Sequence, residues 1–178
     1  MKKLTVKDLA LIALMAVLIA VCSWISIPAA VPFTLQTLGI FLALRLLGGA
    51  KGTVSVLVYI LLGAVGVPVF AGFSGGVGVL FGPTGGYILG FLAAGLVYLL
   101  LEKVPKQGKV MDFLRMAAGL LVCYALGTVW FYYTYGVQNA MGIGSVLMAC
   151  VVPFILPDAV KIVLAQLLAE RLQKVLKL

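Results

Sequence analysis

The chain has 178 residues, of which 64% are hydrophobic and only 10% are charged. A typical soluble domain is about 45–50% apolar and about 25% charged, so this composition is not that of a water-soluble globular protein. It predicts an integral membrane protein made of a single membrane-embedded domain, residues 1–178. No charged, Ser-rich or Pro-rich block is long enough to form a separate soluble domain.

The net charge of +8 does not indicate a nucleic-acid partner, because the basic residues form short clusters between apolar segments and no basic face is present. The chain has no histidine, which removes the commonest general base and metal ligand. Its three cysteines, Cys22, Cys123 and Cys150, include no CxxC pair, and we interpret them as small packing residues. We therefore expect no metal and no cofactor.

Six apolar segments follow one another along the chain. They are residues 9–27, 33–47, 54–69, 87–101, 113–133 and 145–168. A spanning helix needs about 20 residues, which the first, fifth and sixth segments supply. The other three span a membrane only if the glycines and prolines beside them lie at membrane depth, buried against neighbouring helices. We expect an all-α bundle of six transmembrane helices, with five as the alternative.

The charges predict how this bundle is oriented. Basic residues cluster at the N-terminus, after the second segment, after the fourth segment and at the C-terminus: Lys2, Lys3, Lys7, Arg45, Lys51, Lys103, Lys106, Lys109, Arg115, Arg171, Lys174 and Lys177. The connections 28–32, 68–86 and 134–144 carry no charge. The positive-inside rule then places both termini in the cytoplasm. The first apolar run exceeds a signal-peptide core of about 7–15 residues, so we expect a retained helix.

Asp158 and Lys161 are the two charges deep within an apolar segment. Positions i and i+3 share a face of a helix, so both side chains can point into one cavity. Ionisable groups at such depth are costly in lipid and indicate a functional site. The pair offers a hydrogen-bond acceptor beside a donor, which suits a urea-like or amide-like ligand group. A purely structural ion pair is the alternative.

Two further motifs face the same external side. One is the run Gly82, Pro83, Thr84, Gly85, Gly86 and Tyr87, which opens the fourth helix and offers free N–H groups. The other contains the polar residues Thr34, Gln36 and Thr37 at the start of the second helix, and of these we assign Thr34 and Gln36 to the site. Both could contact a ligand, or could serve only as a turn and a helix cap. The connection 68–86 has seven glycines and several apolar residues, including Phe73, and is predicted to fold over the ligand as a lid.

Ala13, Ala16 and Ala20 lie along the first helix at spacings of three and four. Small residues on one face let helices approach closely in lipid. The stripe therefore packs either within the bundle or against a separate membrane protein, and the spacing alone does not distinguish the two.

In combination, VPFTLQT after the first helix, the glycine-rich connection leading into GPTGGY, and LPDAVK in the last helix resemble the BioY family across the whole chain. BioY proteins are the biotin-specific substrate-binding (S) components of energy-coupling factor (ECF) transporters. The resemblance implies a cell-membrane protein that captures biotin from outside. It also implies as partners a coupling membrane protein, which docks on the first-helix alanines, and two cytoplasmic ATPases. Asp158 and Lys161 would then bind biotin.

Two other functions compete with this interpretation. A small secondary carrier for another apolar metabolite could use Asp158 as a proton-coupling group. An intramembrane enzyme is the third class, but the chain has no histidine and a single carboxylate deep in an apolar segment, which argues against catalysis. We therefore expect a transport protein and no enzyme.

Overall fold

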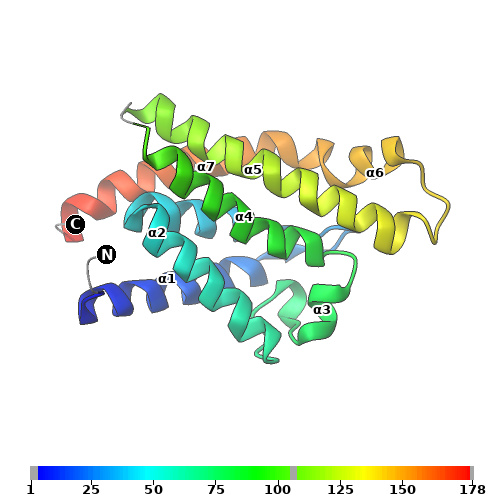
Figure 1. Cartoon of the computed structure of the whole chain (residues 1–178), viewed down its shortest axis with the longest axis horizontal. Helices are drawn as coiled ribbons and strands as arrows, with labels where there is room; N and C mark the ends of the chain where they lie inside the picture. Colours follow the sequence, from blue (N-terminus) through cyan, green and yellow to red (C-terminus); the bar gives the residue numbers. More distant parts are fainter. Residues whose placement is uncertain (1–3, 105–107, 177–178) are drawn as a thin grey trace.

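The computed structural model describes residues 4–104 and 108–176, and long helices lying side by side make up most of it (Figure 1). Lys2, Lys3, Lys106 and Lys177 lie outside the described residues. The helices are α1 (Val6–Trp24), α2 (Gln36–Ala64), α3 (Val77–Phe81), α4 (Gly85–Glu102), α5 (Lys109–Phe131), α6 (Ile143–Cys150) and α7 (Val152–Leu176). Five of the described helical segments are long and apolar enough to cross a membrane.

Helix α2 makes two crossings because it reverses direction at Gly48, where φ is 79°. Such a positive φ favours glycine. In a straight helix Gln36 and Tyr59 would be about 35 Å apart, at about 1.5 Å per residue. Instead, Gln36 Nε2 lies 2.7 Å from the hydroxyl of Tyr59. The carboxylate of Glu102, from α4, caps the returning half of α2 by accepting a 2.8 Å hydrogen bond from the amide of Gly49.

The other crossings follow α1, α4, α5 and the consecutive helices α6 and α7, so the chain passes through the bundle six times. This confirms the predicted all-α bundle. Helix α1 begins with a capping box, in which the Thr5 hydroxyl and the Asp8 carboxylate each accept the other residue's backbone N–H. The last crossing is broken between α6 and α7, whereas the sequence predicted one continuous helix over residues 145–168.

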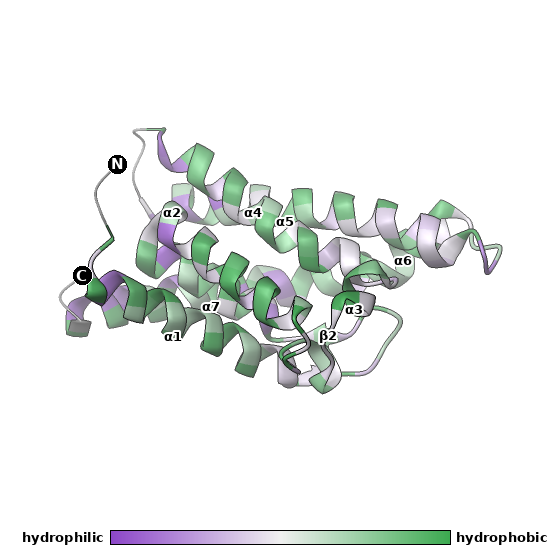
Figure 2. Ribbon diagram, turned by 60° about the horizontal axis from the view of Figure 1, so that its bottom comes forward, coloured by the Kyte–Doolittle hydropathy of each residue, from purple (hydrophilic) through white to green (hydrophobic). Residues whose placement is uncertain are grey.

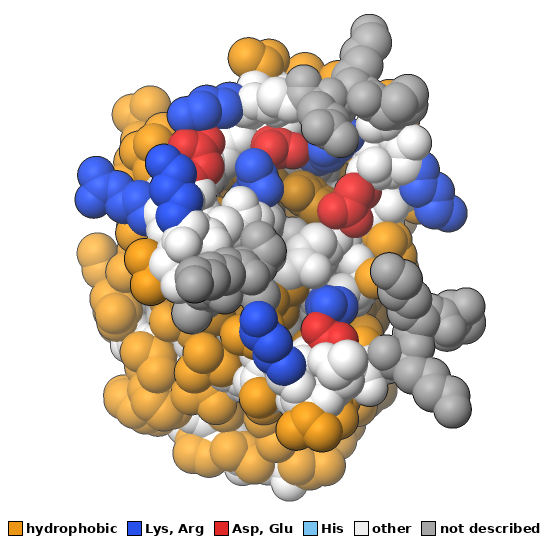
Figure 3. Space-filling model, turned by 90° about the vertical axis from the view of Figure 1, so that its left-hand side faces the viewer, with side chains coloured by type: hydrophobic (Ala, Val, Ile, Leu, Met, Phe, Trp, Pro, Cys, Tyr) orange, Lys and Arg blue, Asp and Glu red, His pale blue; other side chains and the backbone are white. Residues whose placement is uncertain are grey.

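Charges gather at the end of the bundle where α1 begins and α7 ends (Figure 3). By their places in the helices and their ion pairs, the described charged residues there are Lys7, Asp8, Arg45, Lys51, Glu102, Lys103, Lys109, Asp112, Arg115, Glu170, Arg171 and Lys174. Several are paired, including Arg45 with Asp112 at 3.0 Å and Lys109 with Glu170 at 2.9 Å. The long helices are hydrophobic along most of their length (Figure 2), and many of their large hydrophobic side chains are exposed, as a lipid-facing surface requires. We call the end of the bundle where α1 begins and α7 ends the charged end.

The opposite end holds the uncharged connections. Strands β1 (Ser26–Ile27) and β2 (Phe33–Thr34) pair antiparallel between α1 and α2. Between α2 and α4 the chain forms the 3₁₀ turn η1 (Ala71–Phe73) and the short helix α3. Beyond α5 the π-helical turn η2 (Tyr132–Gly136) leads to α6. The predicted lid segment, residues 68–86, is therefore partly helical.

Glycines let the helices pack closely, and one of them brings the two halves of α2 together. A Cβ atom on Gly52 would lie 2.6 Å from the Cα atom of Leu44, which is closer than real contacts allow. We therefore expect Gly52→Ala to force the α2 hairpin open and to destabilise the protein by about 1–3 kcal/mol, as overpacking usually does. The measurement is the midpoint of thermal unfolding in detergent.

Gly144→Ala is the matched control, because Gly144 is also helical and a Cβ there meets nothing within 4 Å. Its midpoint should equal or exceed that of the unmodified protein, since alanine is the better helix former. Equal midpoints for the two variants would show that the hairpin does not depend on contact at Gly52.

Candidate functional site

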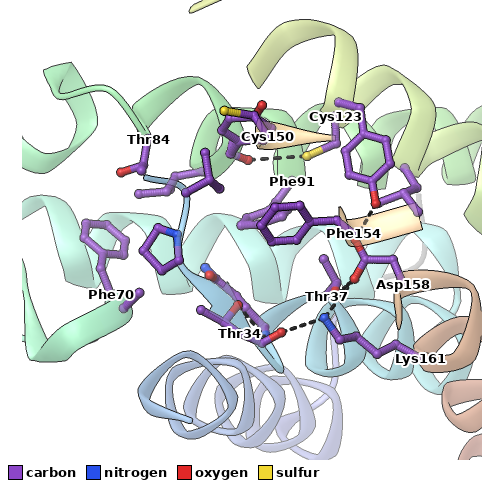
Figure 4. Close-up of a pocket in the computed structure, with 18 of the residues that line it drawn as sticks. Thr34, Thr37, Phe70, Thr84, Phe91, Cys123, Cys150, Phe154, Asp158 and Lys161 are labelled. Carbon is purple, nitrogen blue, oxygen red and sulfur yellow. Dashed lines mark hydrogen bonds and ion pairs between the residues drawn. The ribbon is translucent and has the colours of Figure 1, made fainter. Parts of the chain in front are cut away.

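A cavity of about 100 Å³ lies in the uncharged half of the bundle (Figure 4). Residues of β2 and of helices α2, α3, α4, α5, α6 and α7 contribute to its wall. It is lined by Val31, Pro32, Thr34, Gln36, Thr37, Phe70, Ala71, Ser74, Val79, Thr84, Tyr87, Ile88, Phe91, Leu120, Cys123, Tyr124, Cys150, Phe154, Asp158 and Lys161. The wall is mostly apolar, with a few polar groups among which Asp158 and Lys161 carry charge, which is typical of small-molecule sites.

The Asp158 carboxylate, on α7, is 2% exposed and accepts three hydrogen bonds. Its Oδ1 accepts from Lys161 Nζ at 2.8 Å and from the hydroxyl of Thr37 at 2.9 Å. Its Oδ2 accepts from the hydroxyl of Tyr124 at 2.6 Å. Helices α2, α5 and α7 therefore meet at this one carboxylate. Burial of a charge is tolerated when it is paired and hydrogen-bonded in this way.

Lys161 is 4% exposed, and its ammonium group, like the Asp158 carboxylate, is held by several contacts. Besides Asp158, it donates to the backbone carbonyl of Thr34 at 2.6 Å, and it lies 4.5 Å from the centre of the Phe33 ring. That distance is within the range of a cation–π contact. Phe33 in turn stacks on Phe154, with ring centres 5.5 Å apart. Strand β2 thus supplies both a carbonyl and an aromatic face to the ammonium.

These contacts leave the pair with a small binding capacity. An ammonium has three N–H donors, and two of those of Lys161 point to Thr34 and Asp158. Oδ2 of Asp158 accepts one hydrogen bond, from Tyr124, and has a second lone pair. Among the described contacts, one N–H of Lys161 and one lone pair of Asp158 Oδ2 therefore remain available to a ligand. They lie side by side, and the ion pair as a whole has no net charge.

The wall of the cavity farthest from the charged end includes Phe70, Ala71, Ser74 and Val79 of the predicted lid segment. The chain has two tryptophans, and each donates its indole N–H to a backbone carbonyl near one end of this segment. Trp24 of α1 donates to Pro68 at 2.8 Å, and Trp130 of α5 donates to Gly82 at 2.9 Å. The segment is thus fastened at both ends, while α3 between them has no buried residue.

The structure brings together six of the residues that the sequence singled out for ligand binding. Asp158, Lys161, Thr34, Gln36, Thr84 and Tyr87 all line the cavity. Gly82, Pro83, Gly85, Gly86 and Phe73 do not. Gly85 and Gly86 have a packing role, because a Cβ on them would lie 1.8 Å from the Leu80 carbonyl oxygen and 2.2 Å from Trp130 Cβ, respectively. Phe73 is 64% exposed and stacks on Trp24 at the outer surface.

Thr37, Ser74 and Tyr124 are polar cavity residues that our sequence analysis did not assign to the site. A tyrosine within the apolar run 113–133 is a weak signal, because tyrosines also pack in cores or lie at membrane interfaces. Cys123 and Cys150 line the cavity as buried free thiols, as expected of small packing residues.

The docking face predicted on α1 is wrong for two of its three alanines. Ala16 and Ala20 are 1% and 5% exposed and belong to the hydrophobic core, whereas Ala13 is exposed. The error has a simple cause: spacings of three and four define one helix face but do not tell which way that face points. The outward stripe of α1 contains Ala10, Ala13, Leu14, Val17 and Val21.

A family model described as "BioY family" matches residues 1–178. The chain belongs to the BioY family. A relative named biotin transporter BioY, from Thermotoga maritima, is 46% identical over 160 residues, which cover 88% of this chain and 90% of the relative. A probable biotin transporter BioY from Pyrococcus horikoshii is 43% identical over 168 residues, covering 94% of this chain and 96% of the relative.

Solved structures agree with this membership of the BioY family. The crystal structure of the S-component for biotin from an ECF-type ABC transporter superposes with a TM-score of 0.83 at 29% identity, covering 95% of this chain and 92% of that one. A second structure, an S component of a bacterial ECF transporter, has a TM-score of 0.59 at 20% identity and shows similarity of fold alone. The BioY chain described here is thus a multi-pass membrane protein with the S-component fold.

The burial of Ala16 predicts a clear difference between two substitutions on α1. Ala16→Trp inserts a large ring into the packed core and should destabilise the protein by about 3 kcal/mol or more. Ala13→Trp, one turn away on the exposed face, should fold normally. Thermal unfolding in detergent measures both, and an Ala16→Trp protein as stable as Ala13→Trp would contradict the observed orientation of α1.

Proposed function

We propose that this BioY chain acts as a single membrane-embedded domain that binds biotin from the uncharged side of the bundle and serves its uptake as the S component of an ECF-type transporter. The observation that carries the proposal is the isolated Asp158–Lys161 pair in a largely apolar cavity. The whole-chain family match and the names of the relatives support biotin as the ligand. Biotin would be the transported ligand, with no cofactor.

The unused donor of Lys161 and the unused acceptor of Asp158 favour the ureido end of biotin over its carboxylate end. Biotin carries a ureido ring with two N–H donors and a carbonyl, an apolar body and chain, and a carboxylate. The remaining donor of Lys161 and acceptor of Asp158 complement a neutral group with an adjacent carbonyl and N–H. A carboxylate placed there would accept the Lys161 donor but has no N–H for Oδ2 of Asp158, so it would leave that acceptor unused and lie beside its negative charge. The proposal therefore places the ureido ring at the pair.

The distribution of charge supports an orientation. Lysines and arginines at the charged end outnumber the carboxylates, and the positive-inside rule assigns such an end to the cytoplasm. Both termini would then be cytoplasmic in the cell membrane, and the cavity and lid would face outward. The proposed partners are a coupling membrane protein and two cytoplasmic ATPases, because the sequence has no nucleotide-binding P-loop of its own.

The most direct test identifies the ligand. The protein is purified in mild detergent from cells grown with biotin, denatured, and the released small molecules are analysed by mass spectrometry. Biotin at close to one molecule per protein supports the proposal. A different metabolite would favour a carrier of another specificity, and proton-driven uptake by the protein alone in liposomes would favour a secondary carrier.

The buried pair predicts a large loss of affinity when either partner is removed. Breaking such a pair leaves an uncompensated buried charge and costs about 3–5 kcal/mol. At about 1.4 kcal/mol per factor of ten, Asp158→Ala and Lys161→Ala should each weaken biotin binding about a hundredfold or more. Titration calorimetry provides the measurement. Glu170→Ala is the control, because Glu170 is also charged and on α7 but lies at the charged end, paired with Lys109.

The lid segment predicts a local change in dynamics on binding. Val79 and Phe70 line the cavity, and α3, between the two tryptophan contacts, has no fully buried residue. Biotin should therefore slow amide hydrogen exchange in residues 68–86 more than in the transmembrane helices. Hydrogen-exchange mass spectrometry with and without biotin measures this difference. Equal protection of the lid segment in both samples would mean that it does not close over the ligand.

A further inference from the structure

Tyr124 is buried in α5 and contacts the charged pair directly. Its hydroxyl donates a 2.6 Å hydrogen bond to Asp158 Oδ2, which is short, as bonds to a charged acceptor are. The other two donors to this carboxylate, Thr37 and Lys161, both bind the opposite oxygen, Oδ1. Among the described contacts, the oxygen that has room for a ligand thus has Tyr124 as its one protein donor.

The distribution of donors between Oδ1 and Oδ2 matters because the carboxylate group rotates easily about its bond to Cβ. The torsion that turns the plane of an aspartate carboxylate has a broad energy well, unlike the staggered torsions of saturated carbons. The two donors on Oδ1 restrain this rotation at the oxygen that faces away from the free lone pair. The Tyr124 hydroxyl restrains it directly at Oδ2, the oxygen that has a lone pair left for a ligand, and it occupies the other lone pair of that oxygen. The free lone pair of Oδ2 then has one direction relative to the cavity.

We propose that Tyr124 is a positioning residue for ligand binding, which sets the direction in which Asp158 presents Oδ2 to the ligand. The inference rests on the proposed function, in which Asp158 binds biotin. Tyr124 acts here through Asp158. Thr37 makes a similar bond to the same carboxylate, but it shares its oxygen with Lys161, so its loss leaves Oδ1 still held.

The position of Tyr124 supports this role. The bond joins α5 to α7 at the cavity wall, whereas the other side-chain links between these helices, Gln166 to the Lys109 carbonyl and Lys109 to Glu170, lie toward the charged end. Tyr87, a second tyrosine on the cavity wall, has its hydroxyl 3.2 Å from that of Thr128 and makes no hydrogen bond to Asp158 in the structure. Of these two cavity tyrosines, Tyr124 is therefore the one that hydrogen-bonds to Asp158 in the described contacts.

A double-mutant cycle tests whether Tyr124 acts through Asp158. Biotin affinity is measured by calorimetry for the full chain, Tyr124→Phe, Asp158→Ala and the double variant. Tyr124→Phe removes only the hydroxyl and should weaken binding about tenfold in the otherwise unmodified protein. In the Asp158→Ala background, the same change should alter affinity less than twofold, because the group that Tyr124 orients is already gone.

Two further variants separate positioning from folding. Tyr98→Phe is the matched control, since Tyr98 is also buried but lies at the charged end, and its affinity should be unchanged. Thr37→Val should weaken binding less than Tyr124→Phe does, and this comparison remains informative if one variant folds poorly. Unfolding midpoints of all variants show whether stability and affinity change together.

The outcomes are distinct. Near-native biotin affinity of a folded Tyr124→Phe protein would overturn the positioning role. So would an equal loss of affinity on Tyr124→Phe in the unmodified protein and in the Asp158→Ala variant. In either case, biotin binding by the wild-type chain would leave the proposed function standing. A wild-type chain that does not bind biotin would overturn both. If Thr37→Val weakens biotin binding as much as Tyr124→Phe does, the positioning role is also overturned, because the bonds to Oδ1 and Oδ2 of Asp158 would then matter equally.

Discussion

The buried ion pair between Asp158 and Lys161 is the constraint around which the uncharged half of the bundle is arranged. Taking both charges out of water costs several kcal/mol per ion, which their mutual attraction offsets only when further hydrogen bonds are made. Those bonds come from the start of α2, from β2 and from α5. The pair can therefore exist only if three separate segments converge on α7, and the cavity is the space that this convergence encloses.

The α2 hairpin is what makes the convergence possible. Its first half runs from the cavity to the charged end and its second half returns, so Gln36 and Tyr59 meet although 23 residues separate them in sequence. Gly48 supplies the turn, Gly52 lets the two halves touch, and Glu102 caps the returning half from α4. A polar interaction at the charged end thus fixes the backbone that presents Thr34 and Thr37 to the pair.

The sequence predicted the parts of this design that depend on composition and spacing. Six apolar segments, the clustering of charge at one end and the shared face of Asp158 and Lys161 follow from hydropathy and helical geometry. The partners of the pair do not, because Tyr124 and Thr37 are 34 and 121 residues away from Asp158 and only the packing of helices brings them together. The inward turn of Ala16 and Ala20 was missed for the same reason, since in a helix apolar on every side periodicity does not distinguish lipid from protein.

The charge balance of the pair has a consequence for energetics across the membrane. Moving one elementary charge through a potential of 100 mV changes its energy by about 2.3 kcal/mol. Asp158 and Lys161 lie 2.8 Å apart and sum to zero, so the membrane potential does almost no net work on the site, wherever the site moves within the bilayer. An electrical gradient acting on this pair alone can therefore neither favour nor oppose a reorientation of the empty bundle. The work of exposing the cavity to the other side has to be supplied from elsewhere.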